Sequence, residues 1–172
     1  MPDAISNTSP LLYLHRIDGM NWLPELFTGI YVPGAVVFEL MEGRQKGYDV
    51  PNPSDYHWIT IAEPQVMPSE WFAVDLGMGE IAAMSLALER PDHIVLLDDA
   101  LARKTATVAG LKVWGTLRIL LEVKSQGLVP IIEPLLNRLE DSGMWISEQV
   151  RHRILALAGE KVSQGWMKDK DG

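Results

Sequence analysis

The chain has no cysteine among its 172 residues. This absence excludes disulfide bonds, thiolate-ligated zinc sites and cysteine nucleophiles, and it is typical of proteins in a reducing compartment. The sequence also lacks an apolar run of about 18 residues and a basic N-terminal region followed by an apolar one. We therefore expect a soluble cytoplasmic protein with no membrane association.

Positive charge is also scarce, with 15 Lys and Arg against 23 Asp and Glu and a formal net charge of -8. Such a surface does not hold a nucleic acid through counterion release, so an RNA substrate would need metal ions or a partner to offset the charge. The four histidines lack the His-Glu-x-x-His spacing of zinc hydrolases, and no nucleophile-elbow, Walker or dinucleotide motif is present.

What the chain does have is 47% hydrophobic residues, enough for a sizeable core, in an alternating pattern of strands and helices. Strands are expected at 4–6, 29–32, 58–62, 93–97 and 111–114. Helices are expected at 11–17, 22–27, 35–42, 78–89, 100–108, 116–126, 131–139 and 147–158. Parallel neighbours need a crossover, so the pattern predicts an α/β fold with a parallel sheet. We place one domain at 1–158 and a flexible tail at 159–172.

Oxygen-rich side chains fall near the expected strand ends and in the helices that follow. They are Asn7, Glu39, Glu80, Asp98 and Asp99. Ligands bind beyond the carboxyl ends of the strands in open parallel sheets, so these side chains are candidates for one site. Mg²⁺ and Mn²⁺ prefer such hard oxygen ligands, and these ions support hydrolysis of phosphodiester bonds.

Each of these side chains also has a structural explanation. Asn7 lies in the stretch "ISNTSPLLYL", where Asn, Thr and Ser are typical helix caps and Pro fits the first turn. Asp98 could cap the next helix, and Glu80 and Asp99 could interact with helix dipoles. Glu39 could be solvated, although its neighbours in "VVFELM" are mostly apolar, which favours a partner for its charge.

Five segments together resemble the PIN-domain superfamily, specifically a divergent prokaryotic PIN-like branch. They are "ISNTSPLLYL", "VPGAVVFEL", "LGMGEIAAMSLALE", "VLLDDALARKTATVAGLKVWGT" and "LLEVKSQGLVP". The resemblance implies a three-layer α/β/α sandwich with a central parallel sheet and an acidic cluster that binds Mg²⁺ or Mn²⁺. Many relatives are ribonucleases, including VapC-type toxins that are inhibited by a small antitoxin and often form homodimers.

By position, the resemblance assigns Asn7, Glu39, Glu80 and Asp98 or Asp99 as metal ligands. Asn7 stands where most PIN nucleases have an aspartate, and an amide oxygen is a weaker, uncharged ligand. The carboxylates are then the catalytic residues, and hydrolysis of an RNA phosphodiester bond is the expected reaction. Asp98 and Asp99 are not distinguished by the sequence.

Five further residues are candidates for contacting the substrate: Thr8, Ser9, Arg103, Thr116 and Lys124. The first two would orient water or phosphate. For the others a structural role is also open: Arg103 could pair with Asp99, Thr116 could cap a helix, and Lys124 could be a surface lysine. Trp71 and Phe72, beside a proline-rich loop, are the best candidates for an exposed partner-binding or dimer patch.

Together with the acidic residues, the resemblance implies a Mg²⁺- or Mn²⁺-dependent endoribonuclease, and its VapC-type relatives imply the toxin of a toxin–antitoxin pair. The alternative is a catalytically weakened PIN-like scaffold that binds a protein or RNA partner without cleaving it, which the amide at Asn7 favours. A phospho-receiver domain also uses acidic residues on an α/β sheet, but its acidic pair should follow the first strand, whereas Asp98 and Asp99 come late in this chain.

Overall fold

The computed structural model describes residues 1–161. The chain divides into two compact units, Met1–Thr116 and a second unit that starts at Leu117. The first unit contains the whole sheet and the expected acidic residues, and each unit is described by itself below.

A five-stranded parallel sheet forms the centre of the first unit. Its strands are β1 (Ala4–Ser6), β2 (Ile30–Val32), β3 (Ile59–Ile61), β4 (Ile94–Leu96) and β5 (Lys112–Trp114), in the spatial order β3-β2-β1-β4-β5. In register, Ala4 lies between Ile30 and Ile94. All five strands overlap the segments that the sequence predicts.

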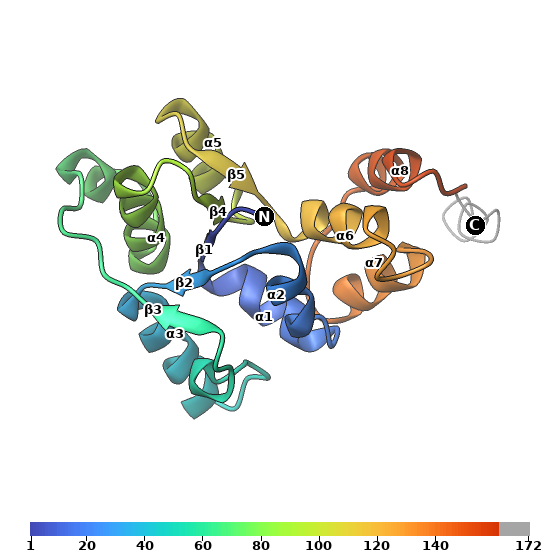
Figure 1. Ribbon diagram of the computed structural model, residues 1–172, viewed down its shortest axis with the longest axis horizontal. Coiled ribbons are helices and arrows are strands. Elements are labelled where there is room, and N and C mark those ends of the chain that lie inside the picture. The colour runs from blue at the N-terminus through green and yellow to red at the C-terminus, as the bar shows by residue number, and fades with distance from the viewer. Residues whose placement is uncertain (162–172) are drawn as a thin grey trace. The chain divides into compact units, whose positions relative to one another are not determined.

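Helices connect each strand to the next and complete an α/β/α sandwich. They are α1 (Thr8–Arg16), α2 (Leu23–Leu26), α3 (Gly34–Gln45), α4 (Met78–Glu89) and α5 (Ala100–Val108), with short 3₁₀ helices η1 (Met20–Trp22), η2 (Pro53–Asp55) and η3 (Ser69–Ala73). In Figure 1, α1 and α4 lie on opposite sides of the strands. The three-layer α/β/α fold and its parallel sheet are therefore confirmed.

The strand order of the sheet reverses between the neighbouring strands β1 and β4. From β1 it moves outward through α1 to β2 and then β3, whereas from β4 it moves the other way through α5 to β5. The Asn7 N–H donates to the Leu96 carbonyl at 3.1 Å, which joins the carboxyl ends of these two strands. In open α/β sheets, this switch point is where a ligand-binding crevice forms.

The buried part of α4 packs into the main core of the first unit. This core includes Ile81, Met84 and Leu86 of α4 together with Ile5 and Val95 of the central strands. Trp71 belongs to the same core and is only 7% exposed, so the expected exposed patch at Trp71 and Phe72 is wrong for Trp71. Of these two residues, only Phe72 is exposed, because adjacent residues of η3 point in different directions.

The second unit contains most of α6 (Thr116–Ser125) together with α7 (Glu133–Asp141) and α8 (Glu148–Leu157). Arg151 of α8 is buried, and its guanidinium donates to Glu140 Oε1 at 2.8 Å and to Asn137 Oδ1 at 2.5 Å. These bonds connect α8 to α7. Across the described residues, 1–161, no helix has the length and apolar character needed to cross a membrane.

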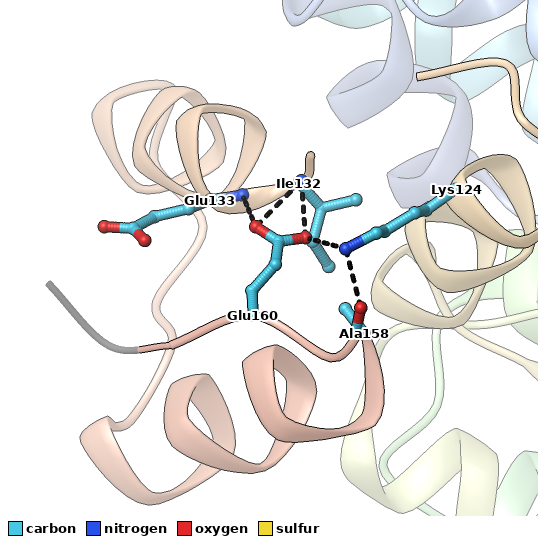
Figure 2. Close-up of polar contacts among 5 residues, drawn as sticks. All are labelled: Lys124, Ile132, Glu133, Ala158 and Glu160. Atoms are coloured by element: carbon cyan, nitrogen blue, oxygen red, sulfur yellow. Dashed lines mark hydrogen bonds and ion pairs between the residues drawn. The ribbon is translucent and has the colours of Figure 1, made fainter. Parts of the chain in front are cut away.

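Glu160, which follows α8, makes polar contacts with α6 and with the start of α7, as Figure 2 shows. Its Oε2 accepts from Lys124 Nζ at 2.8 Å and from the Ile132 N–H at 2.9 Å, and its Oε1 accepts from the Glu133 N–H at 3.1 Å. Lys124 Nζ also donates to the Ala158 carbonyl at 2.6 Å. Glu160 belongs to the expected tail, whose residues 162–172 lie outside the described part of the chain.

Candidate functional site

Asn7 follows β1 and occupies the N-cap position of α1, but its side chain makes no capping hydrogen bond. The residue is 4% exposed, and within residues 1–161 no hydrogen-bond donor reaches its Oδ1 atom. A buried amide oxygen without a donor is costly, since it loses water and gains nothing in return. The capping explanation therefore fails for Asn7, and its oxygen is available to a ligand.

Glu39, in the second turn of α3, is held through both of its carboxylate oxygens. The Thr8 hydroxyl donates to Oε2 at 2.5 Å, and the Gly79 N–H donates to Oε1 at 2.9 Å. Glu39 is thus a half-buried, hydrogen-bonded carboxylate and not a solvated helix residue. It brings together the first turns of α1 and α4, and Thr8 positions Glu39 through this contact.

Glu80, in the first turn of α4, accepts from the Gly77 N–H through Oε1 at 3.1 Å. Its other oxygen, Oε2, is buried and has no hydrogen-bond partner among the described residues. Burial raises the pKa of Glu80 above its ordinary value, the Gly77 N–H opposes this, and the charges of Asp99, Glu39 and Asp75 raise it further. Glu80 is therefore a partly buried carboxylate surrounded by other negative charges, and a cation bound there would be stabilised.

The carboxylates of Glu39 and Glu80 face a common small space beside Gly77. An ideal Cβ atom on Gly77 would lie 3.2 Å from Glu80 Oε1 and 3.9 Å from Glu39 Oε1. Glycine leaves this space open, and the two carboxylates repel one another across it. A cation that binds nearby relieves this repulsion.

Asp98 and Asp99 are adjacent in sequence, but they have different partners. The Asp99 Oδ2 atom accepts from the Ala102 N–H at 2.9 Å and so caps α5, while its charge acts on Glu80. Asp98 turns toward the end of β5, where Thr116 donates to it twice, from its N–H to Oδ1 and from its hydroxyl to Oδ2, both at 2.8 Å. The expectation that Asp98 caps α5 is therefore wrong, and Asp99 is the N-cap of this helix.

Two other side chains face Asp98. An ideal Cβ on Gly115 would lie 3.1 Å from Arg103 Nη1 and 3.2 Å from Asp98 Oδ1, so the guanidinium lies near Asp98 and not in the expected ion pair with Asp99. Burial raises the pKa of Asp98 despite the opposing Thr116 hydrogen bonds and Arg103 charge. Burial and the charge of Asp98 likewise raise the pKa of Tyr13 in α1.

The remaining substrate-contact candidates lie in different surroundings. Ser9 is half-buried in the first turn of α1. The Thr116 hydroxyl donates to Asp98 instead of capping α6, which corrects the capping expectation. Lys124 is partly buried and bonded to Glu160 and Ala158, so it is not a free surface lysine. Arg103 is exposed on α5, and its guanidinium lies next to Asp98.

The geometry limits how a metal could be held. Within residues 1–161, no three His, Cys, Asp or Glu side chains are placed to hold one ion. The two buried oxygens without donors, Asn7 Oδ1 and Glu80 Oε2, nevertheless fit Mg²⁺ or Mn²⁺. Mg²⁺ commonly uses one or two protein carboxylates, while water and substrate phosphate fill the rest of its coordination shell. A third such atom, His93 Nε2, precedes β4, at the opposite end of that strand.

Two residues at this site were not found by sequence reasoning. Gly79 binds Glu39 through its backbone, and Tyr13 lies near Asp98. The signal for Gly79 is the "GMGE" stretch at 77–80, in which glycines precede an acidic residue at a helix start. Tyr13 has no comparable signal, because its proximity to Asp98 depends on how α1 packs.

Comparison with known proteins agrees with this fold and topology. A family model described as a PIN domain matches residues 3–160, which is nearly the whole described chain. No curated protein and no solved structure matches the sequence. The match covers the sheet, its switch point and all of the acidic residues above. This chain therefore belongs to the PIN-domain family.

Proposed function

We propose that this protein is a Mg²⁺- or Mn²⁺-dependent endoribonuclease whose cation is held by Asn7 and Glu80. The proposal combines its PIN-domain membership, which indicates a nuclease-like fold, with the chemistry of the residues at the switch point. The observation that carries it is the pair of buried oxygens without hydrogen-bond donors, Asn7 Oδ1 and Glu80 Oε2. A cation explains both atoms at once, because it supplies the partner that each oxygen lacks.

A bound divalent cation supplies Lewis-acid activation of water and neutralises the charge that develops on the phosphate. Asn7 and Glu80 would hold it, and the nearby charges of Glu39 and Asp99 would add electrostatic attraction. These acidic side chains also explain how a chain with a net charge of -8 could act on RNA, since the cation reverses the local sign of charge.

Arg103 is suited to contact the substrate phosphate. It is exposed on α5, close to Asp98, which is itself fixed by two hydrogen bonds from Thr116. A guanidinium is the preferred side chain for planar recognition of phosphate oxygens. In this proposal Asp98 and Thr116 support Arg103 and do not bind the cation.

The proposal is tested by Mn²⁺-dependent cleavage of a mixed RNA pool. The purified protein is compared with Glu80→Gln, and with Glu42→Gln as a matched control, because Glu42 is exposed on α3 and lies outside the site. Wild type and Glu42→Gln should cleave, and EDTA should abolish cleavage. The cleavage rate of Glu80→Gln should be more than about 100-fold lower than that of wild type. A loss of about 100-fold is the upper end for residues that only orient a metal ligand, so a larger loss indicates a direct ligand.

Equal cleavage by Glu80→Gln and wild type would exclude this site as the origin of the activity. If none of the proteins cleaves a pool that a known PIN nuclease digests, the non-cleaving scaffold is the correct alternative. The toxin role, the small antitoxin, the homodimer and the cytoplasmic location stay predictions from the sequence.

A further inference from the structure

The Glu39 side chain fills the space that a side chain at position 79 would need, so only glycine fits there without a clash. An ideal Cβ atom at this position would be 2.6 Å from Glu39 Oε2 and 2.9 Å from both Cδ and Oε1. Cβ atoms in real proteins essentially never approach other heavy atoms this closely. The backbone of Gly79 does not itself require glycine, because the residue lies within α4 and is not among those with positive φ.

The same residue donates its N–H to Glu39 Oε1 at 2.9 Å, while Thr8 holds the other oxygen. Gly79 therefore both makes space for the Glu39 carboxylate and fixes it by a hydrogen bond. The group that would be displaced by a larger residue is the far end of a flexible side chain, so Glu39 would swing away while α4 stays in place. Glycine at this position is explained by Glu39 and not by the helix.

We infer that Gly79 is a positioning residue, which sets the location of the Glu39 carboxylate beside Glu80 and thereby the strength of cation binding. This inference rests on the proposed function. It assigns a role to a residue that contributes no side chain to the site. Moving Glu39 would remove negative charge from the neighbourhood of Glu80, where a cation is expected to bind.

The test is a double-mutant cycle between Gly79→Ala and Glu39→Ala, with Mn²⁺ affinity measured by calorimetry. Gly79→Ala should weaken binding by about tenfold, because it moves the negative charge of Glu39 away from the cation. In the Glu39→Ala background the same substitution should cause no further loss. A loss of equal size in both backgrounds, or no loss in wild type, would overturn the inference.

A second readout does not depend on the metal. Gly43, inside α3, is the matched control, because an alanine Cβ there meets its nearest atom at an ordinary 3.4 Å. Gly43→Ala should raise the melting temperature by roughly 2 °C, as alanine favours the helix. Gly79→Ala should give a similar rise only in the Glu39→Ala background, and a rise in the wild-type background as well would contradict the clash with Glu39.

The two readouts separate the failure of this inference from failure of the proposed function. If wild type binds no Mn²⁺, the proposed function and the role of Gly79 in cation binding are both overturned, whatever the melting temperatures show. If wild type binds Mn²⁺ and Gly79→Ala binds it equally well, only the role of Gly79 is overturned. Should Gly79→Ala fail to fold while the double variant folds, the clash with Glu39 is supported directly.

Discussion

Asp98 and Thr116 are joined by two hydrogen bonds, one from the Thr116 N–H and one from its hydroxyl, each 2.8 Å long. Both oxygens of Asp98 are therefore engaged, and the bonds connect Asp98, two residues after the end of β4, to Thr116, two residues after the end of β5. A carboxylate that is satisfied in this way is a poor candidate for a metal ligand. The contact instead keeps a partly buried carboxylate hydrogen-bonded and fixes Thr116 at the end of the first unit.

Thr116→Val should destabilise the protein by about 1–3 kcal/mol, because it leaves a partly buried carboxylate oxygen without its donor. It should also raise the pKa of Asp98 further, since the Thr116 hydroxyl lowers it. Urea unfolding at neutral pH measures the first effect. Thr116→Ser retains the hydroxyl and is the control, and equal losses for the two variants would show that the hydrogen bond is unimportant.

Asn7→Asp should have opposite effects on the metal-free protein and on cation binding. A buried carboxylate without a partner should lower the free energy of unfolding by roughly 3 kcal/mol without metal. The added charge should strengthen Mn²⁺ binding by about tenfold or more. Calorimetry and thermal unfolding with and without Mn²⁺ measure both effects. Asn21→Asp, at an exposed position, is the control, and an unchanged Mn²⁺ affinity in Asn7→Asp would argue against Asn7 as a ligand.

Glu80→Gln should stabilise the metal-free protein at neutral pH. Because burial and neighbouring carboxylates raise the pKa of Glu80 in the folded state, wild type loses stability as the pH rises from about 4.5 through that raised pKa. The glutamine variant lacks this loss, so its advantage in melting temperature should be small near pH 4 and grow toward pH 7. An advantage that shrinks with rising pH would contradict the raised pKa.

Glu160→Ala should weaken the second unit by roughly 1.5–3 kcal/mol, since hydrogen bonds to a charged group are lost. Burial opposes its ionisation, but Lys124 and the Ile132 and Glu133 N–H groups hold the pKa of Glu160 below its ordinary value. Hydrogen exchange at those two amides should accelerate. Glu133→Ala is the control, because Figure 2 shows its side chain directed away from Glu160. Unchanged exchange in Glu160→Ala would exclude this role.

Much of the fold could be predicted because each element is encoded locally. The helix Met78–Glu89 and the strand Ala4–Ser6 agree with their predicted bounds. The first helix begins at Thr8, whereas the sequence predicted a start at residue 11. Pro10 fits any position of a first helical turn, so it does not show at which residue that turn starts. Local pattern identifies an element more reliably than its ends.

The site was predicted only in part. The sequence shows which oxygen-bearing side chains come near the carboxyl ends of the strands, but it does not show which donors they accept hydrogen bonds from. Asp98 and Asp99 illustrate this, since adjacent residues in extended backbone point in opposite directions and reach different donors. The burial of Trp71 likewise depends on how η3 packs on the core. Neither the free oxygen of Asn7 nor the steric role of Gly79 can be recognised from the sequence alone, because both depend on how distant segments pack.

In the proposed function, Asn7 Oδ1 and Glu80 Oε2 bind one divalent cation. The most direct test is a crystal structure of the full chain grown with Mn²⁺, in which anomalous scattering locates the metal. We expect an anomalous peak in contact with both oxygens, and we expect this peak to be absent from crystals of Glu80→Gln. A peak at other residues only, or none at saturating Mn²⁺, would contradict it.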